Sequence, residues 1–385
     1  MTDVARTPGE TSLADVAALA ETSFDVITGL QHASGAYPAS PTFSAYAGYS
    51  WFRDGAFIAD AVSAFGGIDS ATRFFDWCAR VLEQHEDQIV RIVAASESGE
   101  PVSDGEMLAT RFTFDGEEGM DAWWDFQLDG YGTWLWAVVE HTRRHGVSLE
   151  PWRHAIDLSV DYLLSSWQRP CFDWWEENAH QVHVSTLGCI AAGLAAAVGA
   201  GTLDHDRGLA TGKAVEEIVS LIRETGTTGG HLAKWLGSTE VDASLLAIVY
   251  PLGVFPASSA IGAATIAAVD RELNIDGGVH RYLADTYYGG GQWPLLSCML
   301  GLAYAATGDR GRAYDQLVWA ASTAGGRGMM PEQVDDHLLA PEMRQEWVDR
   351  WGSVADPLLW SHAMYLRLAV ELGIAGNNFT GESTR

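Results

Sequence analysis

The chain has 385 residues, of which 47% are hydrophobic, and a formal net charge of −28. This composition is sufficient for one large core, but the acidic charge argues against a nucleic-acid partner or an anionic membrane surface, because phosphate groups bind to basic patches. The first residues, MTDVARTPGE, are polar and no run of about 20 apolar residues occurs, so we expect neither a secretory signal nor a membrane span.

In chain order, twelve segments repeat apolar residues at steps of three and four, which is typical of amphipathic helices. They comprise residues 12–30, 55–65, 71–84, 132–145, 155–167, 184–198, 207–222, 242–249, 259–273, 293–308, 310–323 and 358–373. Strand patterns are scarce. RFTFDG, near Arg111, predicts a short strand pair, and HLAKW, near Lys234, is a weaker strand pattern.

No Pro/Ser-rich linker and no change of composition divides the chain. We therefore predict a single catalytic domain over residues 1–385, in which residues 376–385 form a disordered tail. Twelve helices of this size can form six helical hairpins in a double ring, which is an all-α (α/α)6 barrel. A helical solenoid would show a tighter sequence repeat, and none is found.

The loops that enter the even-numbered segments differ from those that leave them. The leaving loops are mostly short, such as GGIDS and TGD, whereas the entering loops are long and rich in carboxylates, tryptophan, tyrosine and arginine. Examples are YAGYSWFRD before the second segment and RPCFDWWEENAHQVH before the sixth. All entering loops of a double ring open at the same end, so we expect these residues to converge on one face.

Four cysteines are scattered singly, without a CxxC pair. They are Cys78, Cys171, Cys189 and Cys298. Isolated cysteines in apolar surroundings indicate buried, reduced thiols and a cytoplasmic location. His180 and His183 have a spacing that a metal could use, but polar loop residues are the favoured interpretation. The chain lacks a GxSxG elbow, a P-loop, a dinucleotide fingerprint and HExxH, so we expect no metal and no cofactor.

Aromatic rings combined with carboxylates and arginine suit a neutral polyhydroxylated ligand, because sugar faces stack on indole rings while charged groups bind the hydroxyls. In FDWWEEN, two tryptophans precede Glu176 and Glu177. A carboxylate beside large rings is costly, because a partly dry setting raises its pKa. That arrangement is useful if Glu176 must hold a proton near neutral pH and donate it.

Hydrolysis of a glycosidic bond needs a second carboxyl group that activates water. Glu332, in MMPEQVDD, is the predicted partner because it follows a proline and apolar residues in a long entering loop. Asp335 and Asp336 are nearby rivals, although such acidic runs are usually solvated.

Seven motifs in order carry a resemblance to glycoside hydrolase family 15, the glucoamylase-like inverting enzymes. They are GYSWFRD, QLDGYG, DWWEEN, EVDASLL, HRYLADTYYGGGQWP, MMPEQ and DPLLWSHA. Each is weak alone, whereas their order and spacing are specific. The match covers roughly residues 30 to 372 and implies the (α/α)6 barrel that the helix count already suggests.

The resemblance also implies residue roles. Glu176 corresponds to the general acid, Glu332 to the general base, and Glu177 to a residue that binds hydroxyls around the leaving sugar. The residues that correspond to the grip and walls of the glucose pocket are Tyr49, Trp51, Arg53, Asp54, Trp123 or Trp124, Asp129, Trp175, Arg281 and Trp293. For Arg53 and Asp54, a simple ion pair at the start of a helix is the alternative.

Two departures from the family bear on the substrate. The chain has neither an N-terminal β-sandwich nor a starch-binding module, and NAHQVHVST after WWEE differs from the expected leaving-group pattern. We therefore expect a short oligosaccharide rather than starch. An α-1,6-linked disaccharide such as isomaltose is favoured because the chain is most similar to the isomaltose glucohydrolases of the family; maltose-type α-1,4 links and trehalose remain open.

Two other classes of function are alternatives. A sugar epimerase or isomerase on the same double ring would use histidines as acid and base, and His183, His231 and His362 would then be the candidates. A non-catalytic sugar-binding protein would need the aromatic residues but no paired glutamates. The expected partner in each case is a small sugar, and the oligomeric state is not predicted.

Overall fold

The computed structural model describes residues 12–119 and 126–376. Within them the helices are α1 Leu13–Leu30, α2 Phe52–Phe65, α3 Ile68–Gln84, α4 Glu86–Glu97, α5 Asp129–His145, α6 Arg153–Ser166, α7 Val184–Ala200, α8 His205–Thr225, α9 Leu245–Val249, α10 Ala260–Leu273, α11 Pro294–Ala306, α12 Arg310–Ser322, α13 Arg344–Trp351 and α14 Leu359–Glu371. Short two-stranded antiparallel sheets pair β1 Tyr49–Trp51 with β2 Arg111–Thr113, β3 Thr227–Thr228 with β4 His231–Leu232, and β5 Asn274–Ile275 with β6 Gly278–Val279.

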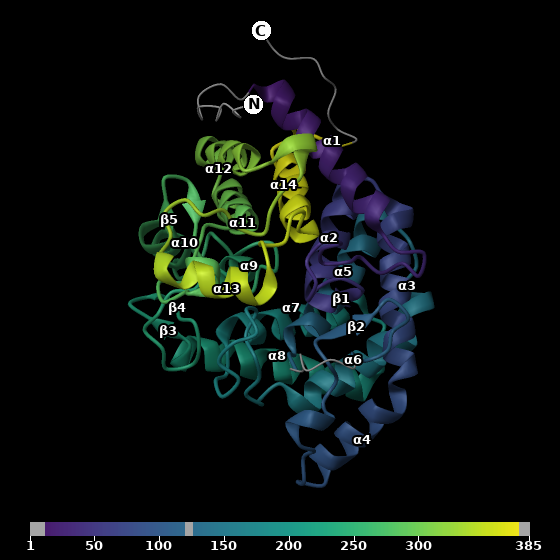
Figure 1. Cartoon of the computed structure of the whole chain (residues 1–385). Helices are drawn as coiled ribbons and strands as arrows, with labels where there is room; N and C mark the ends of the chain where they lie inside the picture. Colours follow the sequence, from purple (N-terminus) through teal and green to yellow (C-terminus); the bar gives the residue numbers. More distant parts are fainter. Residues whose placement is uncertain (1–11, 120–125, 377–385) are drawn as a thin grey trace.

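The helices form two concentric rings (Figure 1). The inner ring is closed, because each of its helices contacts the next and the last contacts the first, in the order α2, α5, α7, α9, α11, α14. Each inner helix also packs against an outer one, and these pairs are α2 with α3, α5 with α6, α7 with α8, α9 with α10, α11 with α12, and α14 with α1. The predicted (α/α)6 barrel is therefore confirmed.

Inner helices are buried over more of their surface than outer helices, as the apolar patterns predict. In α11, every residue from Pro294 to Tyr304 is buried, because both faces of an inner helix meet other helices. In α8, the buried residues are only Thr211, Ala214, Ile218 and Ile222, which lie three or four residues apart on one face. Outer helices therefore carry a single apolar stripe, whereas inner helices are buried on most sides.

Two inner helices approach each other through glycines. A Cβ atom added at Gly193 of α7 would overlap the backbone carbonyl of Gly132 in α5. Backbone atoms cannot rotate away as a flexible side chain could. This contact therefore fixes how closely α5 and α7 pack.

Replacing Gly193 with alanine should destabilise the protein by about 1–3 kcal/mol, the usual cost of overpacking a core. The measurement is the free energy of unfolding in urea. Gly199→Ala is the matched control on the same helix, because a Cβ atom there meets nothing within 4 Å. An unfolding free energy for Gly193→Ala equal to that of the wild type would contradict the packing described here.

All twelve predicted helices are present, but α4 and α13 were not predicted. Helix α4 buries only Ile89 and Ile92, and α13 buries none of its residues, so neither carries a strong apolar period. The strand near Arg111 is present. It pairs with β1, and Phe112 also forms an isolated antiparallel bridge with Glu118. Except for Gly376, the predicted tail lies outside the described residues.

No helix among the described residues is long and apolar enough to cross a membrane. The four cysteines are all buried.

Candidate active site

A pocket lies at the end of the barrel where the inner helices begin. The loops that enter those helices supply most of its wall, as predicted. Its lining comprises Ala39, Tyr46, Trp51, Arg53, Asp54, Trp174, Trp175, Glu176, Arg281, Tyr287, Trp293, Glu332, Leu358 and Trp360. Glu176 and Glu332, 156 positions apart in the chain (332 − 176), therefore face the same pocket.

The loop before α7 presents Glu176 in an unusual backbone conformation. The φ angle of Glu176 is 62°, in the left-handed region that non-glycine residues rarely adopt. Asp173 holds this turn, because its Oδ1 accepts hydrogen bonds from the backbone N–H groups of Trp175 and Glu177, both at 2.9 Å. The Glu176 carboxylate then accepts a hydrogen bond from the indole Nε1 of Trp51 at 2.7 Å. Strain of this kind persists where surrounding contacts enforce it.

Other charged residues hold Asp173 in place. Lys234, whose side chain is 2% exposed, lies 3.9 Å from Asp173 Oδ2 and 3.2 Å from Asp242 Oδ2. Asp242 Oδ2 also accepts a hydrogen bond from Nε1 of Trp175 at 2.9 Å. A buried charge network thus positions the loop that carries Glu176.

Glu332 is buried in the loop before α14, far from Glu176 in the chain. Its backbone N–H donates to the carbonyl of Ala355 at 2.8 Å. Its Oε1 accepts a hydrogen bond from the Tyr46 hydroxyl at 2.9 Å, whereas its Oε2 has no hydrogen-bond partner among the described residues. Burial raises the pKa of Glu332 to about 7, although Tyr46 and Arg281 oppose the rise. One oxygen is therefore fixed and the other is free to take a proton.

The value near 7 predicts a pH dependence. If Glu332 must be ionised, kcat/KM falls as the pH decreases through about 7. Tyr46→Phe removes a hydrogen bond that lowers the pKa of Glu332, so the acidic limb should move to higher pH. The measurement is the pH profile of kcat/KM, with Tyr49→Phe as the matched control. A limb that stays in place, or moves to lower pH, in Tyr46→Phe would contradict this assignment.

Arg53 and Asp54 begin α2 and are both buried pocket residues. Arg53 Nη2 lies 3.2 Å from Asp54 Oδ2, and Arg53 Nη1 contacts Gln127 and Asp129 behind the wall at 2.7 and 3.3 Å. The Nε of Arg53 has no hydrogen-bond partner among the described residues. Burial raises the pKa of Asp54 to about 6 despite the neighbouring Arg53. The pair is thus both an ion pair at a helix start and a polar part of the pocket.

Arg281 lies among aromatic rings on another wall. Its guanidinium carbon is 5.1 Å from the ring centroid of Trp175 and 5.5 Å from that of Trp293. Asp285 Oδ2 accepts from its Nε at 2.7 Å, and Glu177 Oε1 from its Nη2 at 3.3 Å. Glu177 therefore contacts a pocket residue while its own side chain remains 35% exposed.

Several predicted residues lie outside the lining. Tyr49 is on β1, where its ring packs under the guanidinium of Arg111 at 3.8 Å. Asp129 is 1% exposed and supports Arg53 from behind. Asp335 does not line the pocket and pairs with Arg344 at 2.9 Å. Trp123 and Trp124 lie outside the described residues.

Other lining residues were missed by sequence reasoning. Tyr46 lies in the loop YAGYSWFRD and lines the pocket, whereas the predicted Tyr49 in the same loop does not. Tyr287 lies within TYYGGG and its hydroxyl is 3.3 Å from that of Tyr46. Trp360, within DPLLWSHA, packs 5.5 Å from the guanidinium carbon of Arg53. All three lie within loops or motifs that the sequence analysis singled out, but none of the three was itself predicted to line the pocket.

The histidines do not form a second acid–base centre. None of His183, His231 and His362 is among the described residues that line the pocket. His183 Nε2 is 3.1 Å from the carbonyl oxygen of Asn178, and His362 Nε2 accepts from the N–H of Met330 at 3.1 Å. The described residues also contain no group of three or more His, Cys, Asp or Glu side chains placed to hold a metal ion.

The chain is similar in sequence and fold to several known proteins. The family model for glycosyl hydrolases family 15 matches residues 19–317. The isomaltose glucohydrolase of Kribbella flavida is 53% identical over 97% of this chain and 98% of that protein. A glycosidase solved as a glutamate-to-alanine variant in complex with glucose superposes with a TM-score of 0.92 at 53% identity, covering 94% of this chain and 98% of that one. The glucoamylase of Saccharomycopsis fibuligera, 14% identical, shares the fold with a TM-score of 0.74 over 97% of this chain and 98% of its own.

Proposed function

The chain belongs to glycosyl hydrolases family 15 and is a glycoside hydrolase, and from that premise we propose that it releases glucose from the nonreducing end of short α-linked oligosaccharides with inversion. The observation that carries this proposal is the pocket that gathers Glu176, Glu332 and the Arg53–Asp54 pair among tryptophan rings. Two carboxyl groups are what the reaction needs, and the aromatic walls suit the faces of a sugar ring.

In the proposed reaction, Glu176 donates its proton to the glycosidic oxygen as the bond from that oxygen to the anomeric carbon breaks. Glu332 takes a proton from a water molecule whose oxygen attacks the same carbon from the opposite face. For an α-linked substrate the first product is β-glucose. An inverting reaction places the two carboxyl groups about 6.5–9.5 Å apart, which leaves room for the water.

Three residues support the terminal sugar in this proposal. Arg53 and Asp54 offer buried polar groups to its hydroxyls, and Arg281 adds a donor from the aromatic wall. Buried charged groups of this kind bind hydroxyls strongly because the surrounding dielectric is low. Glu177, which holds Arg281 and is partly exposed, is placed to contact the leaving sugar.

We further propose that the substrate is isomaltose or another short α-1,6-linked oligosaccharide. The support is the 53% identity over nearly the whole length of an isomaltose glucohydrolase. The whole chain acts as one catalytic domain, and the burial of all four cysteines favours a cytoplasmic location. An α-1,4 glucohydrolase or a trehalase of the same family is the second candidate, because Glu176 and Glu332 would serve those substrates equally well.

The test is glucose release from isomaltose, maltose, trehalose and dextran, each at several concentrations. We expect the highest kcat/KM with isomaltose. A disaccharide of unchanged mass but new structure, without free glucose, would indicate an isomerase. Sugar binding without turnover of any substrate would indicate a binding protein instead.

A further inference from the structure

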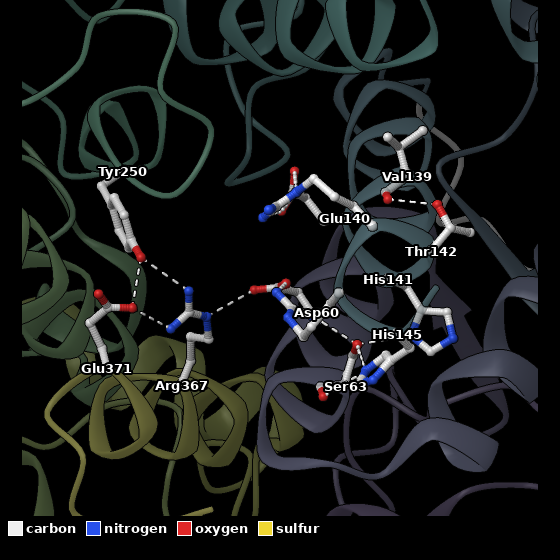
Figure 2. Close-up of polar contacts among 12 residues, drawn as sticks. Asp60, Ser63, Val139, Glu140, His141, Thr142, His145, Tyr250, Arg367 and Glu371 are labelled. Atoms are coloured by element: carbon white, nitrogen blue, oxygen red, sulfur yellow. Dashed lines mark hydrogen bonds and ion pairs between the residues drawn. The ribbon is translucent and has the colours of Figure 1, made fainter. Parts of the chain in front are cut away.

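A second cavity lies at the other end of the barrel, away from the catalytic pocket. Its volume is about 740 Å³, and it is the larger of the two. Its polar wall comes from the later turns of inner helices that begin at the catalytic pocket, with Asp60 on α2, Arg144 on α5 and Arg367 on α14. Figure 2 shows the polar contacts of Asp60 and Arg367 in this region. Its size is within the range of small-molecule sites, about 300–1,000 Å³.

Charged side chains form one connected network along this wall. Asp60 is 2% exposed and accepts hydrogen bonds from Arg144 Nη2 at 2.7 Å and from Arg367 Nε at 3.1 Å. Arg367 also donates to Glu371 Oε2 at 2.7 Å and to the Tyr250 hydroxyl at 3.1 Å. Tyr250 in turn donates to Glu371 at 2.7 Å (Figure 2). The network is therefore rigid and presents both donors and acceptors.

The charges of this network and its rim cancel. Arg143, at the rim, pairs with Glu140 at 2.6 Å. Arg144 pairs with Asp60, and Arg367 pairs with Asp60 and with Glu371, which lies behind the lining, so each of the three arginines has a carboxylate partner. Burial alone would raise the pKa of Asp60, but Arg367 and Arg144 hold it below its usual value, so Asp60 is ionised. Because these charges are paired with one another, the site offers no unpaired charge to a charged ligand.

Aromatic and small side chains complete the cavity. Trp136 is 7% exposed and lines the cavity. The half-buried ring of Tyr250 lines it too, and alanines of α7, among them Ala192 and Ala196, leave the space open. Rings beside paired donors and acceptors match the alternating apolar and hydroxyl surfaces of a carbohydrate.

We propose that this cavity is a second binding site for a neutral polyhydroxylated molecule, a monosaccharide or short oligosaccharide, separate from the catalytic pocket. The sugar packs against the half-buried ring of Tyr250 beside Trp136 and exchanges hydrogen bonds with the charged network. Free glucose has the required chemistry. This assignment does not depend on which linkage the enzyme cleaves.

Alanine-methyl NMR tests the proposal, because both cavities contain alanines. Ala39 lines the catalytic pocket, whereas Ala192 and Ala196 line the second cavity. Glucose is titrated to about 100 mM, which would saturate a site with a Kd of about 1 mM. Ala195→Trp fills the second cavity from an exposed position on α7, and Val198→Trp is the matched control on the same helix, exposed and outside the lining. Ala196→Phe serves the same purpose if Ala195→Trp does not fold.

The expected result is a saturable shift of the Ala192 and Ala196 signals in the wild type and in Val198→Trp. In Ala195→Trp the Ala192 and Ala196 signals should no longer shift, while the Ala39 signal shifts in all three proteins. The proposal is overturned if Ala192 and Ala196 do not respond in the wild type, or if the Ala192 response survives in Ala195→Trp. Stronger binding of glucose 6-phosphate than of glucose at this cavity would also overturn it, because the site would then select anions. Glucose release from isomaltose is measured in parallel, so a failure of the proposed activity is distinguished from a failure of this site.

Discussion

Glu332→Ala is expected to lower kcat on isomaltose by about 10²–10⁴-fold, the usual cost of losing a general base. The free Oε2 of Glu332 is the group that would accept the proton from water, and alanine has no replacement for it. Binding of the disaccharide should be nearly unchanged, because Arg53, Asp54 and Arg281 remain. The measurements are single-turnover kinetics for the chemical step and calorimetry for binding.

Asp335→Asn is the matched control for Glu332→Ala. Asp335 lies three residues along the same loop, but it pairs with Arg344 and does not line the pocket. Its variant should therefore hydrolyse isomaltose at close to the wild-type rate. If Glu332→Ala kept more than about a tenth of that rate, or if only Asp335→Asn were inactive, the base would be misassigned.

Glu176→Gln should show a loss that depends on the leaving group. On isomaltose, the departing sugar oxygen needs a proton, so kcat should again decrease by about 10²–10⁴-fold. On α-glucosyl fluoride, fluoride leaves without protonation, and the loss should be smaller by about tenfold or more. The measurement is the ratio of the two rates in each protein.

Glu332→Ala provides the comparison for that ratio. A base variant should be impaired on both substrates, because water must be activated whichever group departs. Equal losses on isomaltose and α-glucosyl fluoride in Glu176→Gln would show that Glu176 is not the proton donor. Recovery of Glu332→Ala on the fluoride alone would show that the two roles are exchanged.

The barrel could be predicted from the sequence because its inner helices have strong and regular apolar patterns. The same signal failed where burial is slight. Helix α4 packs against α6 with only Ile89 and Ile92 buried, and α13 buries none of its residues. The sequence of each helix therefore resembles that of a polar loop. The pairing of β1 with β2 was also missed, since it joins residues about 60 positions apart through backbone hydrogen bonds that side chains do not encode.

Site residues could be predicted where they stand together in a motif. They were harder to predict where the direction of a side chain decides which residue of the motif faces the pocket. Within YAGYSWFRD, the sequence cannot tell whether Tyr46 or Tyr49 faces the pocket, and the strand that begins at Tyr49 turns that ring to Arg111. Trp360 occupies an apolar position of α14, and an apolar position alone does not show whether a side chain faces the core or the pocket. The second cavity had no sequence signal, because Asp60, Arg144 and Arg367 come from three helices and form no motif.

The stereochemistry of the first glucose released tests the central claim most directly. Proton NMR of isomaltose hydrolysis, recorded before the anomers interconvert, should show β-glucose first, because water activated by Glu332 attacks the face opposite to the oxygen protonated by Glu176. Initial release of α-glucose would mean that the two carboxyl groups do not act on opposite faces, and would contradict the account.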